Sequence, residues 1–167
     1  MAAENAKIKQ INAVDSALAE LRALAPDGFA IGLHITFSTP SFMFQTYPAD
    51  WMTHYTQNGL VLQDPTVLWG FANQGRVDWA DLEDTSPAGV MQQAADYGLI
   101  HGITVAFEEG DSLTIASFAN KTRAFTKDEG AALESLVRAL HKITASEQDL
   151  SAETVQALRA LSIKLTH

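Results

Sequence analysis

Three side chains with polar tips lie close together in the sequence and could bind one small molecule. Trp51 and Tyr55 are four residues apart, so they share a face if this segment is helical. Asp64 follows, directly before Pro65. An indole N–H only donates a hydrogen bond, a phenol donates or accepts, and an ionised carboxylate only accepts. A neutral ligand that contains an amide needs such a mixture of partners.

The same residues also fit a purely structural interpretation. Trp and Tyr on a helix are usually core residues whose polar tips are satisfied locally. An Asp before a Pro is an ordinary helix N-cap. Spacing alone leaves both interpretations open.

Motifs typical of enzymes are missing from the sequence. It has no cysteine and no G-x-S-x-G, H-E-x-x-H, P-loop or G-x-G-x-x-G pattern. The histidines, at positions 34, 54, 101, 141 and 167, do not have the spacing of metal ligands. We therefore expect a binding domain rather than an enzyme, with neither a metal nor a cofactor.

The charge and hydropathy of the chain narrow the choice of partners. Eleven basic and twenty acidic residues give a net charge of −9, the wrong sign for binding phosphates, so this segment is not expected to contact DNA by itself. The apolar runs are far shorter than the ~20 residues that span a bilayer. The first ten residues lack the apolar core of a secretory signal. These features predict no membrane contact and a cytoplasmic location.

Periodicity predicts helices at both ends of the domain and strands between them. A first helix is expected over 4–25, and a long last helix behind the capping box formed by Thr126 and Glu129. Strands are expected over 29–37, 42–47, 102–107 and 112–119, and shorter helices over 48–58, from 65 to about 73, and over 87–97.

This order of elements predicts an α+β fold. The expected architecture is an α-β-α layered sandwich, PAS- or GAF-like, with a central, largely antiparallel sheet of about five strands and helices on both faces. A fifth strand cannot be placed. Residues 1–145 are expected to form the domain, and residues 146–167 a linker leading towards a further module.

The first strand predicts one small face and one bulky face. Strict alternation puts Ala30, Gly32 and His34 on the small face, with Phe29, Ile31, Leu33, Ile35 and Phe37 on the other. The small face could leave room for a ligand.

The motif W-x3-Y-x8-D-P, preceded by Tyr47-Pro48, resembles the acyl-homoserine-lactone (autoinducer)-binding domain of LuxR-type quorum-sensing regulators. The resemblance runs from about Phe29 to Ile143. It includes Trp79 and the segment Gly-Leu-Ile-His-Gly-Ile-Thr at 98–104.

The resemblance implies a role for each residue of the motif. Trp51 would donate its indole N–H to the lactone carbonyl, Asp64 would accept from the ligand amide N–H, and Tyr55 would serve the amide carbonyl. Secondary polar contacts are implied at Tyr47, Thr66 and Ser117. Trp79 is a further ligand-binding position. The resemblance places the acyl tail between the sheet and the helices, and strand alternation and helical spacing give the candidates for its apolar wall: Gly32, Met43 on the face of Tyr47, Leu113 and Ile115 on the face of Ser117, and Val67.

Family resemblance also implies the partners. Members usually form homodimers and contact DNA through a C-terminal helix-turn-helix module, which this sequence does not contain. Three hypotheses follow: the sensory part of a lactone-responsive transcription regulator, a stand-alone lactone-binding modulator, and a sensor of similar architecture for another small molecule. An enzyme that acts on the lactone is the fourth.

Overall fold

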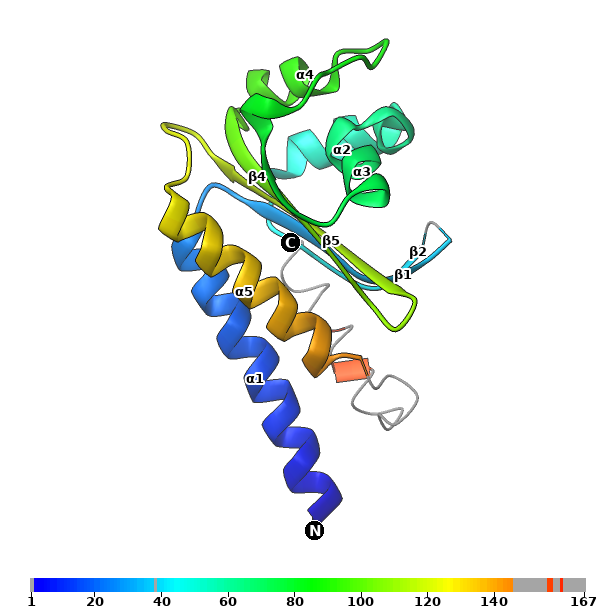
Figure 1. Cartoon of the computed structure of the whole chain (residues 1–167), viewed down its shortest axis with the longest axis vertical. Helices are drawn as coiled ribbons and strands as arrows, with labels where there is room; N and C mark the ends of the chain where they lie inside the picture. Colours follow the sequence, from blue (N-terminus) through cyan, green and yellow to red (C-terminus); the bar gives the residue numbers. More distant parts are fainter. Residues whose placement is uncertain (1, 38, 146–155, 158–159, 161–167) are drawn as a thin grey trace.

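The protein folds into three layers, with a central sheet between two groups of helices (Figure 1). The structure is a computed structural model, and it describes residues 2–37, 39–145, 156–157 and 160. Most of the predicted linker over 146–167 therefore lies outside the described residues. None of the described helices has both the length and the apolar composition needed to cross a membrane.

The sheet has five strands in the order β2-β1-β5-β4-β3, and every neighbouring pair is antiparallel. The strands are β1 (Phe29–Thr36), β2 (Thr39–Gln45), β3 (Gly75–Asp78), β4 (His101–Glu109) and β5 (Ser112–Asn120). The predicted layered α+β fold is confirmed. The strand that the sequence could not place is β3, a short edge strand paired with β4.

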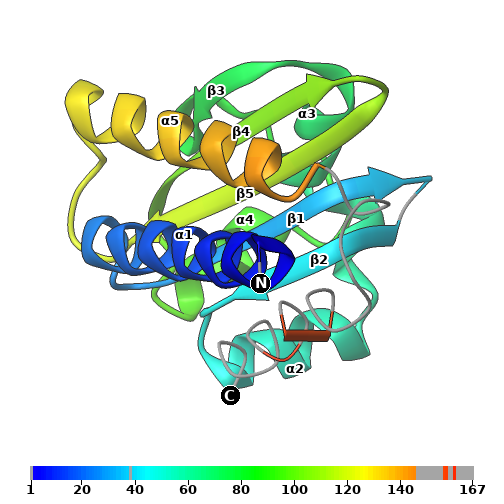
Figure 2. The same cartoon turned by 90° about the horizontal axis from the view of Figure 1, so that it is seen from below.

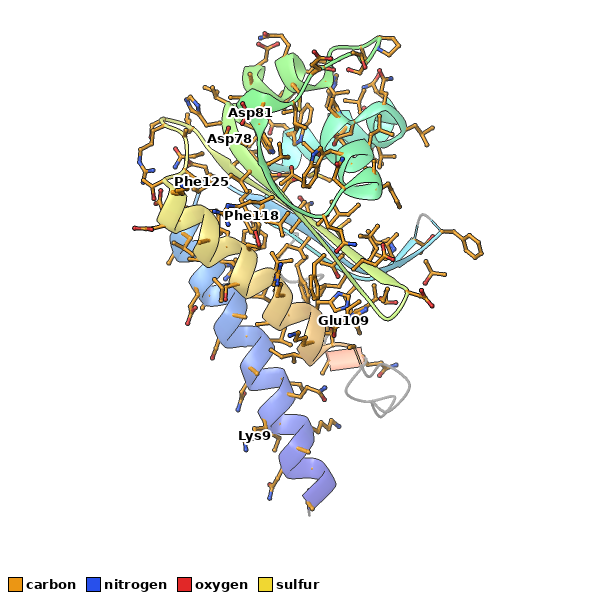
Figure 3. The ribbon with its side chains drawn as sticks, viewed as in Figure 1. Lys9, Asp78, Asp81, Glu109, Phe118 and Phe125 are labelled. Atoms are coloured by element: carbon orange, nitrogen blue, oxygen red, sulfur yellow. The ribbon has the colours of Figure 1, made fainter. Side chains whose placement is uncertain are left out.

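One face of the sheet is covered by α1 (Ala2–Leu24) and α5 (Lys127–Ile143), which lie side by side across it (Figure 2). Their apolar stripes bury Leu21, Leu133 and Leu140 against the sheet. Phe118 of β5 lies between the sheet and these helices, and Phe125 lies at the start of α5 (Figure 3). This apolar core fixes the sheet, whose opposite face is then free to form a site.

Helix α5 begins as predicted. The Thr126 hydroxyl accepts from the Glu129 backbone N–H at 3.1 Å, and the Glu129 carboxylate accepts from the Thr126 N–H at 2.8 Å. The hydrogen bond from the Arg123 guanidinium, together with this cap, lowers the pKa of Glu129 to about 2. The Glu129 carboxylate is therefore ionised at neutral pH, where it serves as the acceptor in the capping box.

The other face carries shorter elements: α2 (Ala49–Gln57), the 3-10 turn η1 (Leu60–Gln63), α3 (Pro65–Ala72), the 3-10 turn η2 (Trp79–Asp81) and α4 (Val90–Asp96). A second, smaller apolar cluster forms here around Trp51, Leu60 and Trp79. Helix α3 lies very close to β5 because residue 70 is a glycine. A Cβ at Gly70 would lie 2.7–2.8 Å from side-chain atoms of Ile115.

The predicted alternation of β1 is wrong beyond Leu33. Gly32 pairs with Ile115 and Ile35 with Leu113, so two residues of β1 face one residue of β5. This is a β-bulge, and His34 has the positive φ of 54° that turns the chain there. His34 consequently faces α5, where its ring contacts His141, while Ile35 joins Ala30 and Gly32 on the other face.

Candidate functional site

A cavity of about 470 Å³ lies between the sheet and the shorter helices. Its size is in the range of small-molecule sites, and its walls are mostly apolar. All the ligand-binding residues predicted from the sequence line this cavity except Leu113. Those that line it are Gly32, Met43, Tyr47, Trp51, Tyr55, Asp64, Thr66, Val67, Trp79, Ile115 and Ser117.

Leu113 is the predicted tail contact that the structure does not bring to the cavity. It is half-buried near the start of β5 and pairs with Ile35, which itself lines the cavity. The prediction for Leu113 assumed that the alternation of side chains along a strand is enough to place Leu113, Ile115 and Ser117 in one site. The bulge in β1 gives this part of the wall to Ile35 instead.

Asp64 is both a helix cap and a wall of the cavity. Its Oδ1 accepts from the Thr66 backbone N–H at 2.9 Å and from the Thr66 hydroxyl at 2.7 Å, which caps α3. Its Oδ2 accepts from the Tyr55 hydroxyl at 2.7 Å. A carboxylate has about four acceptor positions, so one on Oδ2 remains for a further donor. The structural and binding interpretations of Asp64 are therefore compatible.

Tyr55 and Tyr47 stay protonated. Burial raises the pKa of both phenols above their ordinary value, and the nearby charge of Asp64 raises each of them further. The Tyr55 hydroxyl donates a hydrogen bond to Asp64, and the Tyr47 hydroxyl donates one to the Ser117 carbonyl at 3.2 Å. In this state both phenols offer only oxygen lone pairs to the cavity.

Trp51 brings a free hydrogen-bond donor to the site. The side chain is 3% exposed and its ring packs against Tyr55 and Tyr97, with centroids 5.6 and 5.2 Å away. No other described residue accepts a hydrogen bond from its indole N–H. A ligand that covers this N–H without offering an acceptor would lose about 1–3 kcal/mol, so a ligand with an acceptor here would be bound selectively.

Trp79 differs from Trp51, because its indole N–H is already engaged. It donates to the Thr104 hydroxyl at 3.0 Å, and Thr104 in turn shares a 2.8 Å hydrogen bond with the Ser117 hydroxyl. The ring lies flat against β4 at Gly102, where an added Cβ would be 2.3 Å from the ring atoms. Trp79 therefore lines the cavity as an apolar surface.

The floor of the cavity is formed by β1, β2 and β5, in rows that continue across the sheet to residues of β4 outside the lining. The register places Gln45, Ala30, Ser117 and Thr104 beside one another on neighbouring strands. The next row consists of Met43, Gly32, Ile115 and Ala106, which carry no polar side-chain group. One row of the floor is thus polar and the next is apolar.

Several lining residues were missed by sequence reasoning. Gln45 is the most informative, because it is polar, 8% exposed, and on the same face of the chain as Met43 and Tyr47. The two-residue period of β2 was the available signal for it. Ile35 was assigned to the wrong face, and Phe71 and Leu99 have no local signature of a binding site.

The chain matches the family model of the autoinducer binding domain over residues 15–143. It belongs to this family, the autoinducer-binding domain of LuxR-type regulators.

Among curated proteins, the transcriptional activator protein PhzR of Pseudomonas fluorescens is 30% identical over 145 residues, which are 81% of this chain and 59% of the activator. The quorum-sensing regulator RhlR of Pseudomonas aeruginosa is 26% identical over 117 residues, which are 66% of this chain and 48% of RhlR. The match thus spans well under two thirds of each relative. These relatives are transcription regulators rather than enzymes.

Solved structures share the fold. The N-acylhomoserine-lactone-dependent LuxR family factor CepR2 of Burkholderia cenocepacia has a TM-score of 0.60 at 17% identity, covering 87% of this chain and 95% of that one. SdiA in complex with octanoyl-rac-glycerol has a TM-score of 0.63 at 18% identity, covering 84% of this chain and 61% of SdiA.

Proposed function

We propose that the chain binds an N-acyl homoserine lactone in the cavity and releases it chemically unchanged, without a metal or cofactor. The observation that carries the proposal is the unpaired indole N–H of Trp51 in a cavity that Asp64 and Tyr55 also line. The indole N–H donates, the carboxylate accepts, and the phenol can do either, which matches the polar groups of an acylated amino-lactone.

The hydrogen bonds of such a ligand balance those of the site. The ligand amide N–H donates to the remaining acceptor position on Asp64 Oδ2, and Trp51 donates to the lactone carbonyl. Tyr55 can turn its proton from Asp64 to the ligand amide carbonyl, because the ligand N–H takes its place on the carboxylate. No buried polar group of the head is then left unpaired, which is the condition for selective binding.

The acyl tail would lie over the apolar row of the floor. Met43 and Ile115 provide apolar surface there, and Gly32 leaves space that a side chain would fill. Val67 lines the cavity from α3. Burial of each CH₂ group in such a tail contributes about 0.8 kcal/mol.

A second candidate ligand is an acylated glycerol. The structure of SdiA bound to octanoyl-rac-glycerol shows that a protein of this fold accepts an acyl chain without a lactone. Glycerol hydroxyls could donate to Asp64 in place of an amide N–H. The two ligands differ in the lactone carbonyl, which only the first offers to Trp51.

The test is titration of the chain with N-octanoyl homoserine lactone and, separately, with octanoyl glycerol, followed by calorimetry and thermal melting. A ligand that binds only the folded state raises the melting temperature with concentration. Trp51→Phe removes the N–H and keeps a smaller aromatic ring at this position, so we expect about a tenfold weaker affinity for the lactone. Trp69→Phe is the matched control, since Trp69 lies outside the lining of this cavity.

Two results would contradict the proposal. If Trp51→Phe binds the lactone with unchanged affinity, the contact assigned to Trp51 is wrong. Tighter binding of the glycerol ester would favour the second candidate.

Extraction of the bound ligand after denaturation, followed by mass spectrometry, tests for enzymatic activity. We expect intact lactone, whereas progressive hydrolysis would indicate an enzyme.

In this proposal the domain is the sensory part of a transcription regulator that acts as a homodimer. The net charge of −9 is consistent with DNA contact through a separate helix-turn-helix module. Sedimentation of the chain with and without the lactone tests dimerisation, and a monomer under both conditions would contradict it.

A further inference from the structure

One residue of the cavity lining has a buried polar atom without a partner among the described residues. Among the described residues, the side-chain oxygen Oε1 of Gln45 is buried and accepts no hydrogen bond. The whole residue is 8% exposed, and it lines the cavity. Native proteins rarely keep such a group, because each one costs about 1–3 kcal/mol when it is left unpaired.

The position of Gln45 shows which part of a ligand would meet it. Gln45 and Ser117 lie on either side of Ala30 in the polar row of the floor, and the small side chain of Ala30 leaves the space between them open. Ser117 also connects this row to Tyr47, whose hydroxyl is close enough to Asp64 to be affected by its charge. The polar row therefore lies near the head-group residues, with the apolar row beyond it.

The chemistry of an amide determines the best partner. A ligand hydroxyl can donate to the Gln45 carbonyl or accept from its NH₂ group, so it pairs with either orientation of the amide. A keto oxygen can pair only with the NH₂ group and leaves Oε1 unsatisfied. A methylene group pairs with neither. A hydroxylated chain therefore offers the most favourable contact.

We propose that Gln45 is a specificity-determining residue that selects a ligand with a hydroxyl group on its acyl chain close to the amide. This inference rests on the proposed lactone-binding function and specifies the substrate class of the same site.

The test compares three lactones of equal chain length: N-octanoyl, N-(3-hydroxyoctanoyl) and N-(3-oxooctanoyl) homoserine lactone. We expect the full chain to bind the hydroxylated form about tenfold more tightly than the unsubstituted form, with the oxo form between them. In Gln45→Met, which keeps the length of the side chain and removes its hydrogen-bonding groups, the preference is expected to disappear or to reverse. Gln92→Met, on the exposed side of α4, is the matched control and should keep the original ranking.

The outcomes separate this inference from the proposed function. If the chain binds the unsubstituted lactone at least as tightly as the hydroxylated one, or if Gln45→Met keeps the preference, Gln45 does not select the ligand although lactone binding stands. If none of the three lactones binds, both proposals are wrong. Should Gln45→Met fail to fold, the ranking measured on the unaltered chain still decides.

Discussion

Replacement of Asp64 by Asn separates the two roles of this residue, as a helix cap and as a ligand acceptor. The change keeps the size of the side chain and replaces one carboxylate oxygen by an NH₂ group. The oxygen that remains can still accept from the Thr66 backbone and hydroxyl, which bind the present Oδ1 at 2.9 and 2.7 Å. The new NH₂ group takes the place of Oδ2, which faces Tyr55 and, in the proposed complex, the ligand N–H.

The expected magnitude differs between folding and binding. Asn is as good an N-cap as Asp, and Tyr55 can turn to accept from the new NH₂ group, so the free energy of unfolding should change by less than about 1 kcal/mol. Binding loses a hydrogen bond to a charged acceptor, worth about 1.5–3 kcal/mol, and brings two donors face to face. The expected loss of affinity is therefore about 10- to 100-fold.

The measurements are calorimetry with N-octanoyl homoserine lactone and thermal melting without ligand. Asp78→Asn is a matched control, because Asp78 also caps a short helix by accepting from the Ala80 backbone N–H at 3.0 Å and does not line the cavity. Wild-type affinity in a folded Asp64→Asn variant would refute the hydrogen-bond assignment. A large loss of stability without ligand would show that folding depends on the Asp64 carboxylate itself, beyond its role as a helix cap.

Two further predictions concern stability. Gly102→Ala should lower it by about 1–3 kcal/mol, because a Cβ at 2.3 Å would displace the Trp79 ring; an unchanged melting temperature would contradict this packing. Burial and the neighbouring His34 lower the pKa of His141 from 6.5 to about 4, so below pH 6.5 the unfolded chain binds a proton that the folded chain does not. The free energy of unfolding should keep its full value above about pH 6.5 and fall by up to about 3 kcal/mol towards pH 4. Chemical denaturation across this range should show a shallower fall for His141→Gln, and equal slopes would exclude His141 as the cause.

Local patterns in the chain were sufficient to predict most of the fold. The capping box at Thr126 and the cap at Asp64 depend on residues two or three positions away, so both could be predicted without tertiary information. The hairpin of β4 and β5 is equally local. Strand β3 was missed because its four residues form an edge strand whose pairing with β4 depends on residues distant in sequence.

The features of the site also divide into those that the local sequence predicted and those that only the tertiary structure revealed. Trp51, Tyr55 and Asp64 were singled out by their residue types and spacing and assigned to a binding site through the family resemblance. They come together because α2 and α3 are close neighbours in the chain. Spacing did not reveal that the indole N–H of Trp51 is free while the donors of Trp79 and Tyr47 are engaged, since the partners of Trp79 and Tyr47 come from β4 and β5.

Residue types and short-range spacing therefore determined the helices, four of the five strands and the group of Trp51, Tyr55 and Asp64, because these features depend mainly on residues close together in the chain. Only the assembled sheet decided the shape of the cavity floor. The bulge at His34 exchanges the faces of two β1 residues, and the pairing of strands brings Gln45 next to Ala30 and Ser117. Both results come from register between distant strands, which a single segment cannot specify.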